Sequence, residues 1–293
     1  MVRYQRKAKK NAVMVIMLLL MTALIVLPGC AGSKKAAPQR DDVYGSRAYL
    51  HFLAGDMPRA VENYKRGYLA ARQIDNGIGA ARYLSNIGRV FYEMGKADSA
   101  SLYLVKAYEE FKVYGDDAGA SKSAAFLAVC FAAAGDEAQA RRWFGAASSS
   151  LSNSSGKRKD DEHYYAVIRA QIDFRLTSKI NNENALLAAE SFYKKKKDFS
   201  RLATIHTLMA DIELSKGYCV TAARRLNDAL AAIERSNEPY RRSGMLLKLA
   251  AIGFCAGDES AGKHYYGRAA DCAPKGVTVP PLERVSSCAW VCR

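Results

Sequence analysis

Apolar and small residues recur at helical spacing through most of the chain, with few helix-breaking residues among them. Residues 59–238 contain no proline and are rich in alanine, leucine, arginine and lysine. Proline in a helix interior costs about 3 kcal/mol, whereas those four residue types favour helix. No run of alternating β-branched residues competes with this pattern, so it predicts an all-α protein.

One arrangement of side chains returns every 40 residues. Leu127, Ala128 and Phe131 place a large, a small and an aromatic residue on one face of a first helix. Alanines at 140 and 147, on either side of an aromatic residue at 144, give the second helix a stripe whose small members allow close approach. A glycine between the two helices permits a left-handed turn. Five glycines are in phase: Gly55, Gly95, Gly135, Gly217 and Gly257.

These units resemble the tetratricopeptide repeat, and the resemblance extends over residues 44–273. It implies a right-handed superhelical solenoid of antiparallel helix pairs, in which each pair buries its apolar face against its neighbours. The interval of 40 residues exceeds the 34 that are usual in the family. We therefore expect longer helices or longer turns, and about six helix pairs.

The phase of the repeat is lost between residues 147 and 203. Residues 148–161 (SSSLSNSSGKRKDD) have the composition of an inserted loop. A degenerate pair is expected to follow, with helices near 163–177 and 184–197. Residues 274–293 form a tail that contains cysteine and proline.

The N-terminus has the layout of an export signal. Residues 1–11 are basic and residues 12–26 are uninterruptedly apolar. Leu27, Gly29 and Cys30 then resemble the bacterial lipobox. This resemblance implies that residues 1–29 are removed and that Cys30 is acylated, a modification that can be detected with labelled palmitate. Residues 30–43 read as a flexible tether. An aspartate directly after the lipidated cysteine would resemble an inner-membrane retention signal, but this chain has Ala31 there. We therefore expect an outer-membrane lipoprotein that faces the periplasm. The alternative is an uncleaved membrane anchor.

The net charge of the chain does not indicate a nucleic-acid partner. Lysine and arginine number 44 against 29 acids, for a formal charge of +15. Five of these cations stand in residues 1–10, and short basic runs at 157–159 and 194–197 are typical of solvated surface. The charge therefore leaves a membrane and a protein as the expected partners.

No arrangement of side chains suggests catalysis. The four histidines are widely separated, and no HExxH, glycine-rich phosphate loop or Gly-x-Ser-x-Gly elbow occurs. Adjacent carboxylates such as Asp160 and Asp161 are typical of solvated surface. We expect a non-enzyme with no cofactor and no metal.

Six cysteines remain besides Cys30, an even number for an oxidising compartment. Antiparallel stacking would bring Cys219 near Cys255, so these two form either a disulfide or a pair of buried thiols. Cys130 reads as a core residue. Three more cysteines lie around the tail, at positions 272, 288 and 292. The spacing of Cys288 and Cys292 makes a disulfide staple more plausible than a metal site.

The resemblance to the tetratricopeptide repeat implies that the first helices line a groove for extended or helical peptide segments. Five outward-facing residues are candidates for contact with a peptide: Arg82, Ser85, Asn86, Arg89 and Lys122. Three of them are cations, which suggests an acidic segment or a chain-end carboxylate, because arginine can bind a carboxylate through two parallel hydrogen bonds. The alternative is that all five are ordinary exposed helix residues.

Two classes of function stay open. The first is a membrane-anchored periplasmic scaffold or adaptor that binds protein or peptide partners during assembly of an envelope complex. The second is the ligand-binding component of an uptake or sensing system, which would need a closed apolar pocket. The sequence leaves the oligomeric state open.

Overall fold

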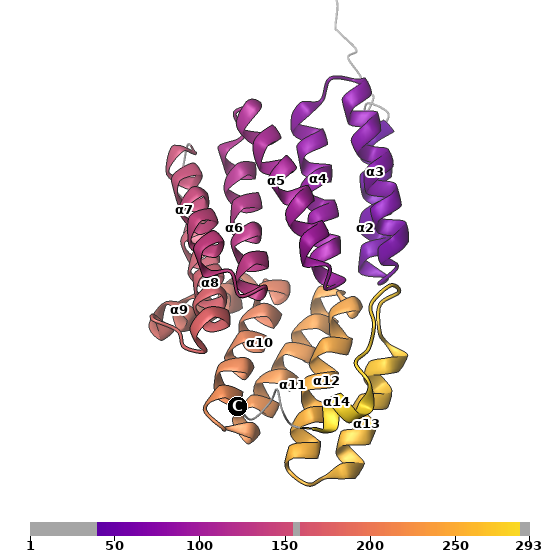
Figure 1. Ribbon diagram of the computed structural model, residues 1–293, viewed down its shortest axis with the longest axis vertical. Helices are drawn as coiled ribbons and strands as arrows, with labels where there is room; N and C mark the ends of the chain where they lie inside the picture. Colours follow the sequence, from indigo (N-terminus) through magenta and orange to yellow (C-terminus); the bar gives the residue numbers. More distant parts are fainter. Residues whose placement is uncertain (1–39, 155–158, 288–293) are drawn as a thin grey trace, which may run out of the picture. The chain divides into compact units, whose positions relative to one another are not determined.

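The computed structural model describes residues 40–154 and 159–287 of the chain. The expected signal segment, Cys30 and the tether up to residue 39 lie outside the described residues, as do residues 155–158, Cys288 and Cys292. The described part consists of successive helices and contains no β-strand (Figure 1).

Within the described residues, twelve helices form six antiparallel pairs, as the repeat predicts. A 3-10 turn, η1 (Pro239–Arg241), precedes α12, and a short helix, α14 (Leu282–Ser286), follows the last pair. The pairs are α2 (Arg40–Leu53) with α3 (Met57–Gln73), α4 (Gly77–Glu93) with α5 (Ala97–Val113), α6 (Asp117–Ala133) with α7 (Glu137–Asn153), α8 (Lys159–Thr177) with α9 (Glu183–Lys196), α10 (Phe199–Ser215) with α11 (Cys219–Ser236), and α12 (Arg242–Cys255) with α13 (Glu259–Asp271).

The 40-residue interval arises from longer helices rather than longer turns. Helices α3 to α7 each have 17 residues, and three residues join each helix to the next. One helix with its connection therefore takes 20 residues, and a pair takes 40.

Most connections use a left-handed residue followed directly by an N-cap residue. The left-handed residues include all five of the glycines in phase, with φ between 71° and 80°. Asp136 shows the capping, since its carboxylate accepts a hydrogen bond from the Gln139 amide at 3.0 Å. Such a cap satisfies one of the amide groups that have no partner within the helix. Asp56, Asn76, Asp116, Asp198 and Asp258 cap their helices in the same way.

The loop expected at residues 148–161 is wrong for most of its length. Helix α7 continues through 148–153, and α8 begins at 159. The serines are accommodated because their hydroxyls donate to carbonyls within the helix, as Ser148 does to Phe144 at 3.0 Å and Ser152 does to Ser149 at 2.7 Å. Ser150 is buried, which extends the buried stripe of α7. The serine-rich composition therefore predicted a longer interruption of the helices than the structure has.

The fourth pair is nevertheless packed differently from the others. Helix α8 contacts α6 and α9 extensively but has few contacts with α7. This is the region in which the sequence loses its phase, and the two helices expected there are confirmed as α8 and α9. A change of packing, not a loss of helix, interrupts the repeat.

The first pair contacts the two segments that flank the last pair, namely η1 before α12 and the residues that follow α13. The Lys275 amide donates a hydrogen bond to the Gly55 carbonyl at 2.8 Å, and Lys275 Nζ lies 3.6 Å from the Asp56 carboxylate. Tyr240 of η1 is only 5% exposed and belongs to the apolar cluster formed by α2, α3 and α4. Repeats in an open solenoid contact only their neighbours, so these contacts join parts that stacking alone leaves apart.

Within the described ranges, no helix combines the length and the hydropathy needed to cross a bilayer.

Candidate functional site

Four of the five predicted groove residues lie on α4, and the fifth lies on α6. Arg82, Ser85 or Asn86, and Arg89 are three or four residues apart, so they share one face of α4. Arg82 is exposed, whereas Ser85, Asn86 and Arg89 are partly buried. The Ser123 hydroxyl on α6 donates to Ser85 Oγ at 3.3 Å, so Ser85 connects two first helices.

Asn86 and Arg89 line a common cavity, which we call the Arg89 pocket. It has a volume of about 250 Å³. Helices α2, α3 and α4 contribute its seven residues: Gly45, Tyr49, Phe52, Tyr64, Asn86, Arg89 and Val90. Three aromatic rings, one carboxamide and one guanidinium therefore surround a space that is smaller than the usual 300–1,000 Å³ of a drug-sized ligand site. The cavity is large enough for the side chain or chain end of a single peptide residue.

The guanidinium of Arg89 has unused hydrogen-bonding capacity. Its Nη2 donates to the Tyr240 hydroxyl at 3.4 Å, and its central carbon lies 5.1 Å from the centre of the Phe52 ring, a cation–π contact. Its Nε is buried and has no hydrogen-bond partner. Buried polar groups are normally satisfied, so an unpaired Nε beside a cavity indicates a place for an acceptor.

No carboxylate in the described part of the chain forms an ion pair with Arg89. Glu238 is occupied elsewhere, since it accepts hydrogen bonds from Ser200 Oγ and from Arg241 Nη1, all at 2.9 Å. Burial raises the pKa of Glu93, although Arg241 and Arg89 oppose the rise, so its charged form is disfavoured.

Arg89 itself keeps its charge. Burial acts to lower its pKa, but Tyr240, Glu93 and Glu238 outweigh that effect, and the pKa is raised overall. The pocket therefore contains a permanent cation that Glu93 and Glu238 influence without forming an ion pair with it.

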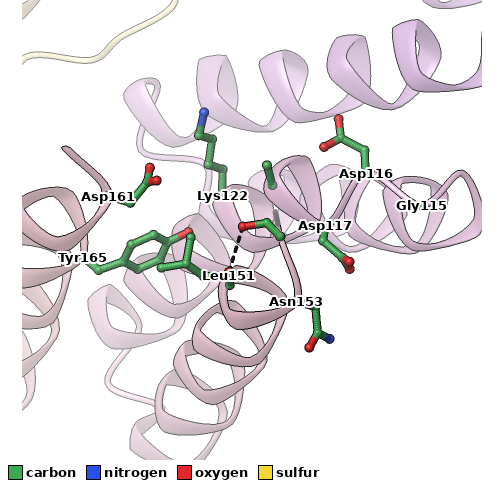
Figure 2. Close-up of a pocket in the computed structure, with 10 residues that line it drawn as sticks. Gly115, Asp116, Asp117, Lys122, Leu151, Asn153, Asp161 and Tyr165 are labelled. Atoms are coloured by element: carbon green, nitrogen blue, oxygen red, sulfur yellow. Dashed lines mark hydrogen bonds between the residues drawn. The ribbon is translucent and has the colours of Figure 1, made fainter. Parts of the chain in front are cut away.

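Lys122 is separate from this site. It lines a second, larger cavity of about 540 Å³ between α6, α7 and α8, in which Figure 2 shows it among Asp161, Asp116 and Asp117. Asp117 pairs with Lys112 at 2.6 Å. The three predicted cations therefore do not converge, because Arg82, Arg89 and Lys122 occupy different surroundings.

Tyr165, which lines this second cavity, is bound by a serine that stands where the repeat has an alanine. The Ser121 hydroxyl lies 2.5 Å from both the Ala147 carbonyl and the Tyr165 hydroxyl. These bonds tie α6 to α7 and α8, which explains why Ser121 is buried despite its polarity. The cavity's rim at Ser154 borders residues outside the described ranges, so we assign no function to it.

The structure shows neither of the two alternatives for Cys219 and Cys255, a disulfide between them or a pair of buried thiols. Cys219 is a free thiol, whereas Cys255 is disulfide-bonded. Both side chains pack against the same apolar cluster. Sharing a cluster is not sufficient, because a disulfide requires Cα atoms within about 7 Å and converging Cβ directions.

Cys130 is a buried core residue, as predicted. Burial raises the pKa of its thiol to about 12, with a small opposing effect of Arg175. The thiol therefore stays protonated and unreactive at neutral pH.

Sequence reasoning missed the aromatic residues that line the Arg89 pocket or contact Arg89 from behind it. Phe52 and Tyr64 could have been found as apolar positions on α2 and α3. Tyr240 could not, because it lies 151 residues from Arg89 in a connection that carries no repeat signal.

Comparison with known proteins supports the fold. Residues 40–112, which span α2 to α5, match the tetratricopeptide repeat family. Among solved structures, the chain is similar to the Rap conjugation gene regulator of the plasmid pLS20 in complex with the Phr* peptide, with a TM-score of 0.58 and 17% sequence identity over 96% of this chain and 72% of that chain. At this identity the likeness shows the fold alone. No curated protein sequence matches the chain.

Proposed function

We propose that this protein is a non-catalytic adaptor that binds a peptide or a peptide segment of a protein along its first helices. The tetratricopeptide match over α2 to α5 supports this function, because arrays of such repeats present extended binding surfaces. The similar Rap regulator was solved with a peptide bound. The observation that carries the proposal is the Arg89 pocket, which lies within the matched region and contains a cation without an ion pair.

The chemistry of the pocket favours a partner that presents a carboxylate. Arg89 offers an unpaired Nε, and Asn86 offers a carboxamide that can both donate and accept hydrogen bonds. Tyr49, Phe52 and Tyr64 provide apolar walls for the carbon atoms next to that carboxylate. A chain-end carboxylate or an acidic side chain would supply the missing acceptor.

A peptide library tests this proposal directly. Synthetic peptides would be prepared with free and with amidated C-termini and sorted for binding to wild-type protein. We expect enrichment of acidic or free-carboxylate peptides, at least a tenfold loss of their binding in Arg89→Met, and their recovery as intact molecules. Arg141→Met is the matched control, because Arg141 lies on the second helix α7, away from the Arg89 pocket, and pairs with Glu137 at 2.7 Å.

Equal binding by wild type and Arg89→Met would move the site away from this pocket. Cleavage or modification of the bound peptides would contradict a non-catalytic role.

We also propose that the adaptor is anchored by acyl chains on Cys30 and faces the periplasm from the outer membrane. The support is the basic, apolar and cysteine order of residues 1–30. Cells grown with radiolabelled palmitate should label the wild-type protein and not Cys30→Ser. Equal labelling of both proteins, or of neither, would contradict the anchor, and fractionation would then show where the chain resides.

A further inference from the structure

The contact of η1 with α2 and α4 uses two residues that line the Arg89 pocket. The rings of Phe52 and Tyr240 lie 4.4 Å apart between centroids, and the Arg89 guanidinium contacts both of them. Tyr240 is not itself part of the cavity wall. Phe52 and Arg89 therefore have the cavity on one side and η1 on the other.

The hydrogen bond between Arg89 and Tyr240 is long and therefore weak. Its length of 3.4 Å exceeds the usual 2.7–3.2 Å for a nitrogen donor and an oxygen acceptor. Within the described residues the Tyr240 hydroxyl has no other hydrogen bond. A carboxylate is a stronger acceptor for a guanidinium than a neutral phenol, and it can engage two donors at once.

We propose that Arg89 is shared between Tyr240 and the ligand, so that a carboxylate entering the pocket takes the guanidinium from Tyr240 and loosens the contact of η1 with α2 and α4. This inference rests on the proposed function, which supplies the carboxylate. It adds that carboxylate binding is coupled to the contact of η1 with α2 and α4. Coupling is reciprocal, so anything that weakens the Arg89–Tyr240 bond must strengthen carboxylate binding.

The test uses acetate as the probe and the side-chain resonances of arginine as the readout. Full-length protein with ¹⁵N-arginine would be titrated with sodium acetate against sodium chloride at constant ionic strength. The Nε–H signal of Arg89, identified by its loss in Arg89→Lys, should shift saturably with acetate. Tyr240→Phe keeps the ring against Phe52 and removes only the hydroxyl, so acetate should bind about two- to tenfold more tightly.

Tyr218→Phe is the matched control, because Tyr218 is an exposed tyrosine in the connection before α11. Its acetate affinity should equal that of wild type. In wild type, acetate should also speed amide exchange at Arg241, whose amide bonds the Glu238 carbonyl within η1.

The outcomes separate the two proposals. If acetate shifts Arg89 equally in wild type and Tyr240→Phe, the carboxylate site stands and the coupling is wrong. If the Arg89 signal does not respond to acetate in either protein, the carboxylate site fails and the coupling fails with it.

Discussion

At the scale of residues, the sequence placed the right side chains on the right helix but not their partners. Asn86 and Arg89 could be assigned to one face because helical periodicity is visible within a single repeat. Their surroundings depend on Phe52 and Tyr240, which approach from other elements and follow no local rule. Lys122 was grouped with them because its helix has the same role, yet it lies in a different cavity. Two residues on the first helices of neighbouring pairs can therefore lie in different cavities.

Tyr64 gives the pocket a measurable dependence on alkaline pH. Its pKa is raised to about 12, chiefly because burial opposes ionisation, while Arg89 acts to lower it and Tyr49 to raise it further. A tyrosine in an unfolded chain ionises near pH 10. Because the folded state holds the proton more tightly, Tyr64 contributes its full stability below pH 10 and loses it as the pH rises toward 12.

Urea unfolding of wild type and Tyr64→Phe at pH 9 and pH 11 measures this effect. The free energy of unfolding of wild type should fall by roughly 1–1.5 kcal/mol more than that of the variant. The other buried tyrosines are common to both proteins and cancel in the difference. Parallel pH profiles would contradict the assigned shift.

At the scale of elements, the sequence predicted six pairs and the 40-residue interval, but not the 20-residue module beneath it. The left-handed positions show this module, and glycine occupies only some of them. Asp75, Lys197 and Asn237 take the same conformation, with φ of 54°, 56° and 55°. A search for glycine alone therefore sees every second connection in parts of the array.

Two glycines in or next to α7 provide a matched test of the connections. Gly135 has a φ of 79°, Gly145 lies within the helix, and an added Cβ meets nothing within 4 Å at either position. Gly135→Ala should lower the free energy of unfolding by about 1 kcal/mol, because a left-handed conformation disfavours a Cβ. Gly145→Ala should raise it by roughly 0.5–1 kcal/mol, because alanine favours helix over glycine.

Thermal or urea unfolding of the two variants and of wild type measures these changes in the free energy of unfolding. Changes of the same sign would show that the connection is not held in its left-handed form.

At the scale of the whole molecule, the contacts of η1 and Lys275 could not be predicted from the repeat. Stacking rules describe neighbours, whereas Tyr240 completes an apolar cluster built from α2, α3 and α4. The packing of α8 against α6 rather than α7 also departs from the repeat. The sequence signalled that alteration only as a loss of phase.

Tyr240→Ala tests how far this contact carries stability. Removing a ring that is 5% exposed leaves a cavity, at a cost of roughly 3–5 kcal/mol for a large aromatic residue. Amide hydrogen exchange followed by mass spectrometry should therefore speed up in α2 and α4, not only in α11 and α12. Tyr218→Ala, at an exposed tyrosine, should leave all four helices unchanged. Faster exchange confined to α11 and α12 would mean that the first pairs do not depend on the contact.

The hydrogen bond between Lys275 and Gly55 also bears on how such a chain can vary in length. An open array tolerates the gain or loss of a complete unit, because its two ends are independent. Here the deletion of one pair would carry Tyr240 away from Phe52 and Lys275 away from Gly55. The number of units is therefore as much a specified property of this protein as any side chain in its core.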